Sequence, residues 1–469
     1  MSTRPLVRRA APGPGALRVP VVIIGAGACG LTAALRLVAA GIDTVLIERD
    51  AAPGGSTALS SGFIPAAGSA VQRAAGIEDD ASRFAADIQA KAGGMAAPHL
   101  VAAYAGAAAQ AVDELSRRGL AFEVLDGFLY PGHTAYRMHT LPERSGAALV
   151  AALTREATAA GADLLSAARA TEIWVDEQNR VTAVACERPD GTVEVIACDV
   201  LILACNGFGG NATMVSRYLP AMRDAVYGGH VGNDGSAIEW GVQLGARLAD
   251  LAAYQGHGSW ATPFGVLISW AIMMGGAVQV NQNGQRFHDE THGYSEAAVQ
   301  VLAQPGGIAW DVFDEPARAL VSAFPDFMQA ESNRTVRVCA DLAELAMVIG
   351  CDADVLLQTL DSVSPGAVDA HGRRFERGLS APYYAVKVTG ALFHTQGGLD
   401  IDAQCRVLND TGVPFPNLLA AGGAARGVSG NDVSGYLSGN GLLSAVAGGY
   451  IAAATAAVQL GRHLDATAD

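Results

Sequence analysis

The first clear hydrophobic pattern of the chain lies between residues 20 and 50. Residues 21–24 are consecutively apolar, Val-Val-Ile-Ile, and the run breaks at the glycine-rich stretch 25–30. Apolar residues then recur at positions 31, 34, 35 and 38, the spacing of one helix face, and a second apolar run occupies residues 45–47. This pattern predicts a strand, a tight turn, a helix and a second strand.

The glycine-rich turn reads Gly-Ala-Gly-Ala-Cys-Gly, so its glycines follow the spacing G-x-G-x-x-G. Gly25 permits the tight turn, Gly27 lets the backbone approach a pyrophosphate, and Gly30 lets helix and strand pack closely. The helix N-terminus offers free N–H groups and a positive dipole end to phosphate. Glu48, directly after the second apolar run, stands where an acid receives ribose hydroxyls. The stretch predicts a dinucleotide site rather than a chance glycine-rich turn.

A loop of small residues follows the second strand. It contains Pro-Gly-Gly-Ser-Thr at positions 53–57 and Ser-Ser-Gly at positions 60–62. Such residues let the chain run close along a flat cofactor. An ordinary surface loop has the same composition, but the position directly after the dinucleotide strand favours a cofactor contact.

The remaining pattern alternates between helical and extended periods. Residues 98–117 and 146–160 have helical spacing, and residues 173–196 alternate with period two, which predicts a three-stranded meander. Residues 199–210 predict a buried strand that ends in a second glycine turn. The polar, aromatic loop 127–143 either reaches the active site or lies on the surface.

This order of elements predicts an α/β fold with two domains. Residues 1–18 lack a long apolar run, and we expect them to form a disordered tail. We expect the first domain to be split in sequence, with residues 19–225 and 386–469 as its two parts. Residues 226–385 then form an inserted domain.

The composition narrows the class of protein. A net charge of -15 and a pI near 5.1 argue against nucleic-acid and anionic-membrane partners. The seven cysteines show no metal-binding spacing, which indicates reduced thiols in a cytoplasmic protein without a metal site. The uncharged stretches 263–281 and 433–460 approach transmembrane length, but polar residues interrupt both. We expect them to be buried elements and predict no membrane span.

Further sequence blocks join these in a fixed order. They are ILACNGFGGN at 202–211, GNDG at 232–235, GQRFHDE at 284–290, HTQGG at 394–398 and NLLAAGG at 417–423, followed by an apolar helix. Together they resemble the fumarate reductase and 3-ketosteroid dehydrogenase superfamily of flavoproteins over residues 20–460. The resemblance implies a Rossmann-like FAD-binding domain, split in sequence, and an inserted α+β capping domain. It also implies that the active site lies between the two.

The resemblance implies that the turns of the first domain hold FAD. Because residues 54–62 contain no His, we expect the FAD to be bound noncovalently. The expected FAD contacts are Gly25, Gly27, Ala28, Cys29, Gly30, Glu48, Arg49, Gly55, Ser56, Thr57, Ser61, Gly62, Ala204, Gly207, Asp234, Gly423, Gly441 and Leu442.

The GQRFHDE block locates a candidate base. In the fumarate reductases the residue four positions after the Glu of this block is an Arg that donates a proton; here Tyr294 stands four positions after Glu290. The ketosteroid Δ1-dehydrogenases have a Tyr in a similar place that removes the α-proton. A free Tyr titrates near about 10, so such a base needs an activating neighbour. His292, Tyr383 and Tyr384 are the candidates for it.

Other candidates come from the second half of the chain. Tyr436 and Gly439 lie in a run that resembles the carbonyl-binding Tyr-Pro-Gly-Pro-Gly segment of the ketosteroid enzymes, one residue shorter and without the prolines. His394 instead matches a substrate-binding His of the fumarate reductases. His257 is either a substrate contact or a satisfied core histidine. Arg426 binds either a substrate carboxylate or the FAD pyrophosphate.

These residues predict an FAD-dependent desaturase that acts on the CH–CH group of a cyclic ketone. The substrate is a 3-oxosteroid or a smaller ring such as 4-oxocyclohexanecarboxylate. Tyr294 removes the α-proton, Tyr436 and a backbone N–H near Gly439 stabilise the enolate, and FAD N5 takes the β-hydride. The alternative is a fumarate-reductase-like enoate reductase, and a remote alternative is a non-catalytic flavin-binding protein. The electron acceptor is then external: a quinone, another protein or oxygen.

Overall fold

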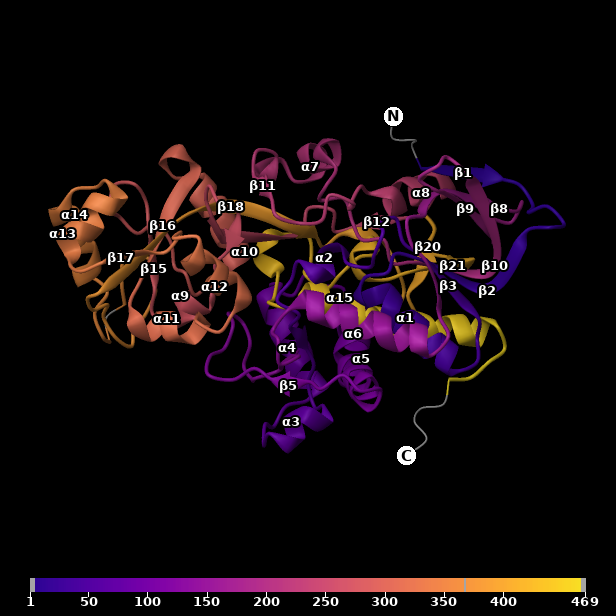
Figure 1. The fold of residues 1–469 in the computed structure, drawn as a ribbon, viewed down its shortest axis with the longest axis horizontal. Helices are drawn as coiled ribbons and strands as arrows, with labels where there is room; N and C mark the ends of the chain where they lie inside the picture. The colour runs from indigo at the N-terminus through magenta and orange to yellow at the C-terminus, as the bar shows by residue number, and fades with distance from the viewer. Residues whose placement is uncertain (1–4, 367, 465–469) are drawn as a thin grey trace.

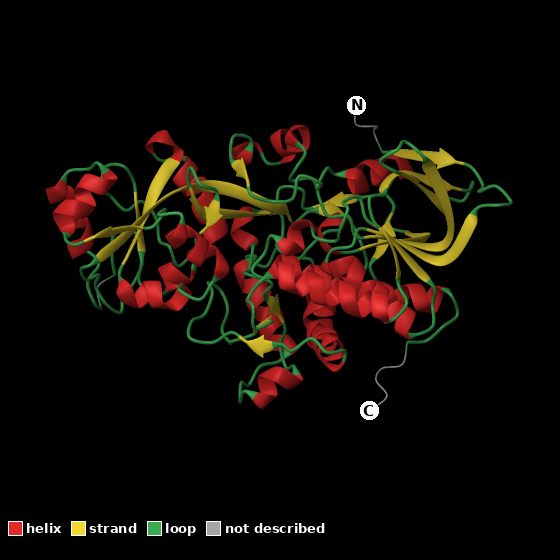
Figure 2. Ribbon diagram, in the orientation of Figure 1, coloured by secondary structure: helices red, strands yellow, loops and turns green. Residues whose placement is uncertain are grey.

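Two β-sheets organise the chain, and long helices lie between and below them in Figure 1. The computed structural model describes residues 5–366 and 368–464. A nine-stranded sheet lies on the right of Figure 1 and a seven-stranded sheet on the left. Figure 2 shows helices against both sheets. The α/β class predicted from the alternating periods is confirmed.

The nine-stranded sheet contains the predicted dinucleotide strands at its centre. Strand β2 lies between β3 and β10 and is parallel to both, with Val21 opposite Thr44 and Val200. The apolar runs are buried on both faces, which is why they lack an alternating pattern. Its strands are β1 (Leu6–Arg9), β2 (Leu17–Ile24), β3 (Thr44–Ile47), β7 (Asp163–Leu165), β8 (Arg169–Val175), β9 (Val181–Glu187), β10 (Val193–Leu203), β20 (Arg406–Leu408) and β21 (Pro414–Ala420).

The helices of this region pack closely because their contact faces carry small residues. A Cβ added at Gly449 would lie 2.3 Å from the carbonyl oxygen of Cys29, so α15 and α1 meet backbone to backbone. The helices are α1 (Ala28–Ala39), α2 (Gly55–Ala58), α3 (Ala70–Ala74), α4 (Ala81–Lys91), α5 (Pro98–Arg117), α6 (Gly146–Ala159), α7 (Ala212–Tyr218), α8 (Ser236–Leu244) and α15 (Asn440–Gln459). The expected helix 98–117 is confirmed residue for residue.

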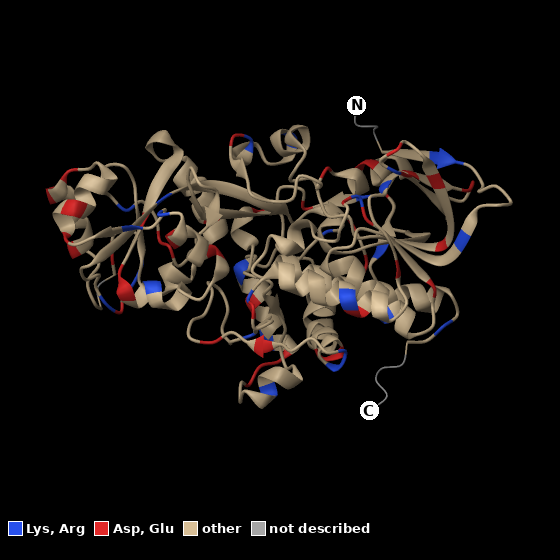
Figure 3. Ribbon diagram, viewed as in Figure 1, with Lys and Arg blue, Asp and Glu red and all other residues tan. Residues whose placement is uncertain are grey.

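Helix α15 is long and apolar enough to cross a membrane by composition alone. In the fold it is a core helix, because Val446, Ala453 and Ala457 are fully buried in the same hydrophobic cluster as α1. Figure 3 shows charged residues spread over both regions, and the sequence of α15 contains none. Its apolar character therefore has a sufficient explanation in packing.

The seven-stranded sheet is built around one long strand, β18 (Tyr383–Thr395), which pairs with most of the others. Those are β11 (Val226–Tyr227), β13 (Tyr254–Ala261), β14 (Val266–Leu267), β15 (Val278–Val280), β16 (Ile308–Phe313) and β17 (Arg337–Cys339). The helices around it are α9 (Ala271–Met274), α10 (Tyr294–Leu302), α11 (Glu315–Val321), α12 (Pro325–Ser332), α13 (Leu342–Ile349) and α14 (Ala353–Asp361).

Short elements complete the fold. A three-stranded sheet contains β4 (Ile64–Pro65), β5 (Glu123–Val124) and β6 (Met138–Thr140), and a two-stranded one contains β12 (Leu248–Ala249) and β19 (Gly398–Leu399). The 3-10 turns are η1 (Pro220–Met222), η2 (Pro305–Gly307), η3 (Gly422–Ala424) and η4 (Val433–Gly435).

The structure contradicts the expected disordered tail over part of its length. Residues 6–9 form the edge strand β1, which pairs in parallel with β8. Arg8 forms an ion pair with Glu172 and lies over the ring of Trp174. An edge strand with mostly exposed side chains has no apolar period, so the hydrophobic pattern could not reveal it. Residues 1–4 lie outside the described part.

The strands also differ from the expected domain limits. Strand β18 continues without a break to Thr395, so the limit at residue 385 falls inside the second sheet. Ala237, Trp240 and Leu244 of α8 belong to the core of the first region, although the inserted domain was expected to begin at residue 226. The chain crosses between the regions near Tyr254, which pairs with Thr395. The strands that run between the two regions have the same hydrophobic pattern on both sides of the boundary. Composition therefore does not mark where one domain ends and the other begins.

Candidate active site

One long cavity runs from the glycine turn of the first region to the face of the second sheet. Its first part, here called the dinucleotide end, is lined among others by residues 24–29, 47–50, 228–230, 232–234 and 236. Its second part, here called the aromatic end, is lined by Phe63, Tyr130, Met138, Gln255, His257, Leu267, Ser269, Trp270, Tyr294, Phe393, His394, Gln396, Tyr436, Ser438 and Gly439.

The glycine turn leaves no room for side chains. Gly25 has φ +106°, and a Cβ there would lie 2.5 Å from the carbonyl oxygen of Ala204. A Cβ at Gly30 would lie 1.9 Å from the carbonyl oxygen of Gly25. Helix α1 begins after Gly27 without a cap from that residue, the N–H of Ala28 donates to the Thr57 hydroxyl, and Ala28 and Cys29 line the cavity at the start of the helix. This arrangement fits a bound pyrophosphate.

Glu48 is buried beneath the same turn. Its carboxylate accepts hydrogen bonds from the backbone N–H groups of Ala26 and Asp50, both at 2.9 Å. A carboxylate has further lone pairs, and Glu48 lines the cavity. The residue therefore orders the loop and remains available to ribose hydroxyls.

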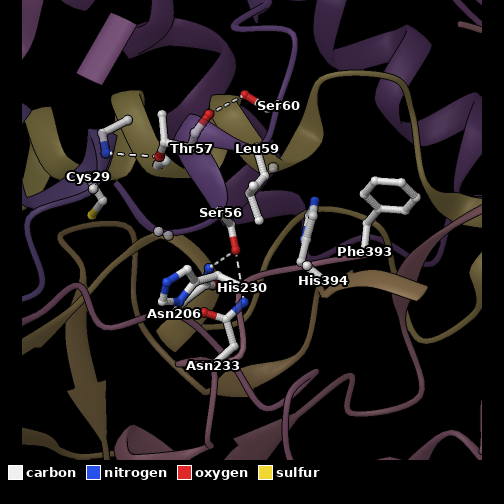
Figure 4. A pocket seen from close by; sticks show the side chains of 18 of the residues that line it. Cys29, Ser56, Thr57, Leu59, Ser60, Asn206, His230, Asn233, Phe393 and His394 are labelled. Carbon is white, nitrogen blue, oxygen red and sulfur yellow. Dashed lines mark hydrogen bonds between the residues drawn. The ribbon is translucent and has the colours of Figure 1, made fainter. Parts of the chain in front are cut away.

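The small-residue loop after β3 joins segments far apart in the chain. The hydroxyl of Ser56 accepts hydrogen bonds from the side-chain amides of Asn206 and Asn233, each at 2.8 Å (Figure 4). The hydroxyl of Thr57 accepts a hydrogen bond from the N–H of Ala28 at 3.0 Å. This loop lines the cavity as expected, and Asn206 and Asn233 are lining residues that the sequence motifs did not single out.

Charged groups gather at the dinucleotide end. Arg49 and Arg169 lie 3.7 and 3.6 Å from the carboxylate of Asp234, and His230 lies 3.0 Å from Asp50. Arg49 also donates to the carbonyl oxygen of Gly232 at 2.9 Å, which holds the 228–235 loop against the end of β3. Arg169 and His230 are further lining residues that no motif indicated.

Tyr294 is the first residue of α10 and lies at the centre of the aromatic end. Its ring stacks on His257 at 4.7 Å and stands edge-on to Trp270, Tyr130 and Tyr436 at 6.3, 6.4 and 6.0 Å. Burial, together with the neighbouring Tyr436, raises the pKa of Tyr294 well above its usual value. The hydroxyl is therefore neutral in this environment.

Tyr436 follows the turn η4 and precedes α15. Its hydroxyl donates to the side-chain carbonyl of Gln255 at 3.2 Å and accepts from the N–H of Gly441 at 3.4 Å. Burial raises the pKa of Tyr436. Gly439, the N-cap of α15, has φ +87°, and a Cβ there would lie 2.8 Å from Pro65. The start of a second helix therefore faces the cavity, beside the Tyr436 hydroxyl.

Both histidines of the aromatic end are neutral. Burial lowers the pKa of His257 to about 3 and that of His394 to about 4. The Nδ1 of His394 lies 3.1 Å from the amide nitrogen of Gln396, and a Cβ at Gly441 would lie 2.6 Å from its Nε2. His257 accepts a hydrogen bond from the N–H of Ser259 at 3.1 Å. Neither ring brings a positive charge to the cavity.

The structure does not bring Tyr383 and Tyr384 to this site. Tyr384 donates a hydrogen bond to Glu315 at 2.6 Å and stacks on Phe313 at 5.4 Å, while Tyr383 packs against another hydrophobic cluster. Neither lines the cavity, because the long strand β18 carries its first residues away from it. The proposed activator His292 is 73% exposed and lies 3.8 Å from Asp289.

The remaining expected residues divide into liners and supports. Gly30, Gly62 and Gly207 do not line the cavity, but a Cβ at each would collide with neighbouring atoms. The expected residues that do line it are Gly25, Gly27, Ala28, Cys29, Glu48, Arg49, Gly55, Ser56, Thr57, Ser61, Ala204, Asp234, His257, Tyr294, His394, Gly423, Tyr436, Gly439, Gly441 and Leu442.

Arg426 lies outside the cavity and is held by two carboxylates. It pairs with Asp250 at 2.5 Å and with Asp400 at 3.5 Å, and it does not line the cavity.

The charged block around residue 290 is structural. Arg286 and Arg373 hold the buried carboxylate of Glu290 at 2.6 and 2.7 Å. Burial acts to raise the pKa of Glu290, but the Arg286 hydrogen bond and the charge of Arg373 outweigh it and hold the pKa at about 2. This network fixes the loop that leads into Tyr294.

The motifs missed Tyr130 and Trp270. Tyr130 comes from the 127–143 loop, for which a surface position was the alternative; the structure places Tyr130 in the cavity and Tyr136 outside it. The hydroxyl of Tyr130 lies 3.4 Å from that of Ser269. The aromatic composition of the 127–143 loop was the available signal. Only the tertiary contact of Tyr130 with Tyr294 decides between a loop that reaches the active site and one on the surface.

The fold and the cavity define a dinucleotide-binding flavoprotein with an inserted second domain. The chain belongs to the FAD binding domain family, which matches residues 20–442. It is an FAD-dependent oxidoreductase, and the sequence-based assignment of FAD is confirmed.

Three known proteins illustrate the relationship. The chain is 28% identical to NADH:fumarate oxidoreductase of Klebsiella pneumoniae (strain 342), over 88% of this chain and 45% of that protein. It is 25% identical to 4-oxocyclohexanecarboxylate 2-dehydrogenase of Sinomonas cyclohexanicum, over 86% and 87% of the two chains. It superposes on 3-ketosteroid-Δ4-(5α)-dehydrogenase from Rhodococcus jostii RHA1 with a TM-score of 0.77 and 23% identity, over 97% of this chain and 99% of that one. The expected superfamily is confirmed.

Proposed function

We propose that this protein desaturates a cyclic ketone between its α- and β-carbons, with a bound FAD as hydride acceptor. The observation that carries the proposal is the meeting of the Tyr294 and Tyr436 rings, 6.0 Å apart, at the end of a flavin-binding cavity. The two residues come from different sheet regions, so their meeting is a property of the assembled site. FAD supplies two-electron oxidation when bound.

Tyr294 is the proposed base for the α-proton. Because its pKa is raised, the hydroxyl must release its own proton to a neighbour as it accepts one from carbon. Tyr130 is the proposed neighbour: its ring stands edge-on to that of Tyr294 with centroids 6.4 Å apart, and it would relay the proton by accepting it while its own proton passes to the Ser269 hydroxyl, 3.4 Å away. Burial raises the pKa of Tyr130 to about 12, so its hydroxyl is a hydrogen-bond donor. Tyr130 takes the part expected of Tyr383 or Tyr384.

Tyr436 is the proposed donor to the ketone oxygen. Its raised pKa keeps the hydroxyl protonated, as a hydrogen-bond donor to an enolate must be. The backbone N–H near Gly439, at the start of α15, is the proposed second donor, and the positive end of that helix favours the same charge. Each donor of this kind contributes about 3 kcal/mol to the transition state.

The aromatic end favours an uncharged substrate. Among its described lining residues are neutral rings, amides and hydroxyls and no Lys, Arg, Asp or Glu. Burying a carboxylate without a partner costs several kcal/mol. This supports an uncharged cyclic ketone, such as a 3-oxosteroid, over 4-oxocyclohexanecarboxylate, and it opposes the alternative of a fumarate-like enoate reductase. His394 remains as a neutral hydrogen-bonding group for either reaction.

The proposal is tested by anaerobic reduction of the purified flavoprotein, followed by flavin absorbance. We expect a 3-oxosteroid or cyclohexanone to bleach the flavin, with 4-oxocyclohexanecarboxylate slower and succinate inactive. Tyr294→Phe should bind FAD but lower the bleaching rate by about 10²- to 10⁴-fold. If no ketone bleaches the flavin while fumarate reoxidises the reduced protein, the desaturase is wrong and the reductase stands. Once a substrate that reduces the flavin is known, turnover with that substrate can be measured with a quinone, another protein or oxygen as the electron acceptor.

A further inference from the structure

One lysine links the two regions of the molecule beside Tyr294. Lys91 is the last residue of α4, and its Nζ donates to the carbonyl oxygen of His292 at 2.7 Å and forms an ion pair with Glu296. Helix α4 belongs to the core of the flavin region through Phe84 and Ile88. His292 and Glu296 belong to the loop and first turn of α10, in the second region. The contact therefore crosses the boundary along which the cavity lies.

The two groups held by Lys91 flank the proposed base. His292 and Glu296 stand two residues before and two residues after Tyr294. The intervening Gly293 has φ +139°, and a Cβ there would lie 2.7 Å from the Glu296 carboxylate and 3.3 Å from the Lys91 Nζ. The turn therefore packs closely around the ammonium group. It has no space for a side chain at position 293.

The stem of Lys91 also contacts the loop that carries Tyr130. A Cβ at Gly132 would lie 3.5 Å from the Lys91 Cδ and 2.8 Å from Leu437, the neighbour of Tyr436. Lys91 thus lies where the segments of all three proposed site tyrosines converge.

The pair is largely shielded from water, with side-chain exposures of 11% for Lys91 and 19% for Glu296. The ammonium group lies beside the N-terminus of α10, whose dipole disfavours a cation, and its two oxygen partners offset that cost. Removing one partner of a shielded pair leaves the other charge uncompensated. The arrangement is consequently tight, and it fixes the position of the α10 N-terminus against the flavin region.

We propose that Lys91 is a positioning residue that holds Tyr294 in place for proton removal from across the domain boundary. The role of Tyr294 rests on the proposed function, whereas the clamp itself does not. A displacement of about 1 Å in a base costs on the order of 100-fold in rate, which is why a residue that never touches substrate can matter.

The test compares Lys91→Met with Lys387→Met. Lys91 and Lys387 are the only lysines of the chain, and Lys387 is exposed on β18, so the second variant is a matched control. We expect Lys91→Met to retain FAD and substrate affinity but to lower the rate constant of flavin reduction by about 10- to 100-fold. Lys91→Arg should recover most of that loss, and Lys387→Met should change nothing. An unchanged reduction rate in Lys91→Met overturns the proposal.

Two further measurements keep the proposal falsifiable. If Lys91→Met fails to fold, Glu296→Gln, which keeps a hydrogen-bond acceptor, should show a smaller fall in the same rate constant; an unchanged rate overturns the proposal. If no ketone reduces the native flavoprotein, acylation of the two lysines, followed by mass spectrometry, still tests the clamp. Lys91 should react much more slowly than Lys387 in the holoprotein, and equal reactivity shows that no clamp exists.

Discussion

The two ends of the cavity are built from different material. The dinucleotide end is made of backbone groups in a contiguous glycine turn, with Glu48 and Arg49 directly after the next strand. The aromatic end is made of side chains from distant segments, of which Tyr130, Tyr294 and Tyr436 are the proposed reacting set. Backbone recognition needs a short sequence of fixed spacing, whereas a side-chain constellation needs several elements in register. The comparison explains why a cofactor fingerprint is readable locally and a substrate site is not.

The ends also differ in charge. Arg49, Arg169, Asp234 and Asp50 are partly exposed at the dinucleotide end, where water screens their interactions. The described residues of the aromatic end are neutral and mostly buried, so polar contacts there are stronger but an unpaired charge is costly. The same cavity therefore binds a polyanionic cofactor at one end and favours an uncharged ring at the other.

The largest effect is expected at the dinucleotide end. Gly30→Ala would place its Cβ 1.9 Å from the carbonyl oxygen of Gly25, so the turn cannot keep its shape. We expect the variant to be purified without flavin or not to fold, measured by absorbance and thermal unfolding. Gly106→Ala is the control, because Gly106 is exposed on the outer face of α5 and nothing lies within 4 Å of a Cβ built there. That change should be neutral or stabilise by up to about 1 kcal/mol.

The next effect is expected at the aromatic end. Tyr436→Phe should retain FAD and lower the rate constant of flavin reduction by about 10²- to 10³-fold, because one donor to the enolate oxygen is lost. Tyr384→Phe is the control, since the Tyr384 hydroxyl binds Glu315 outside the cavity. Its loss should cost about 1 kcal/mol of stability and leave the rate unchanged. Equal losses of rate in the two variants would show that Tyr436 is not the donor to the enolate oxygen.

A smaller effect concerns pH. The pKa of His257 is lowered to about 3 and that of His394 to about 4, from 6.5 in the unfolded chain. Below pH 6.5 the two histidines are therefore protonated in the unfolded state but remain neutral in the folded state until the pH approaches 4. This contribution to stability is fully present above pH 6.5 and is lost as pH falls from there toward the folded pKa values. Denaturant unfolding of the holoprotein between pH 7.5 and pH 5 should show the decline, on the order of 1.4 kcal/mol per pH unit for each such group.

The variant His257→Gln tests the source of that decline. Its slope of unfolding free energy against pH should be shallower than that of the native chain, but not flat. His133 and His288, whose pKa values burial also lowers to about 4, continue to contribute. An unchanged slope would show that His257 carries a proton in the folded state.

The smallest effect on activity is expected outside both ends. Arg426 pairs with the shielded carboxylates of Asp250 and Asp400, so Arg426→Gln should lower stability by about 3 kcal/mol but leave substrate KM unchanged. KM from initial rates and thermal unfolding separate the two. A large rise in KM that is seen only for a carboxylated ketone would indicate that Arg426 binds the substrate carboxylate.

Local patterns predicted the elements whose apolar period is strong. The helix over residues 98–117 and the paired strands around the glycine turn are confirmed. The edge strand at residues 6–9 was missed because its side chains are exposed, and the domain limit at 385 was wrong because β18 is continuous across it. Tyr383 and Tyr384 were wrongly drawn into the site because motif likeness does not say which way a long strand runs.

The sequence by itself determined the cofactor, since a glycine turn, a helix start and an acid at fixed spacing suffice to bind a dinucleotide. The spacing of four residues from Glu290 also indicated Tyr294 as the candidate base. Only the tertiary structure decided which tyrosine faces it, that His257 and His394 are neutral, and that Lys91 ties the two regions together. Those properties depend on burial and on contacts between residues separated by large stretches of chain, and no local spacing encodes either.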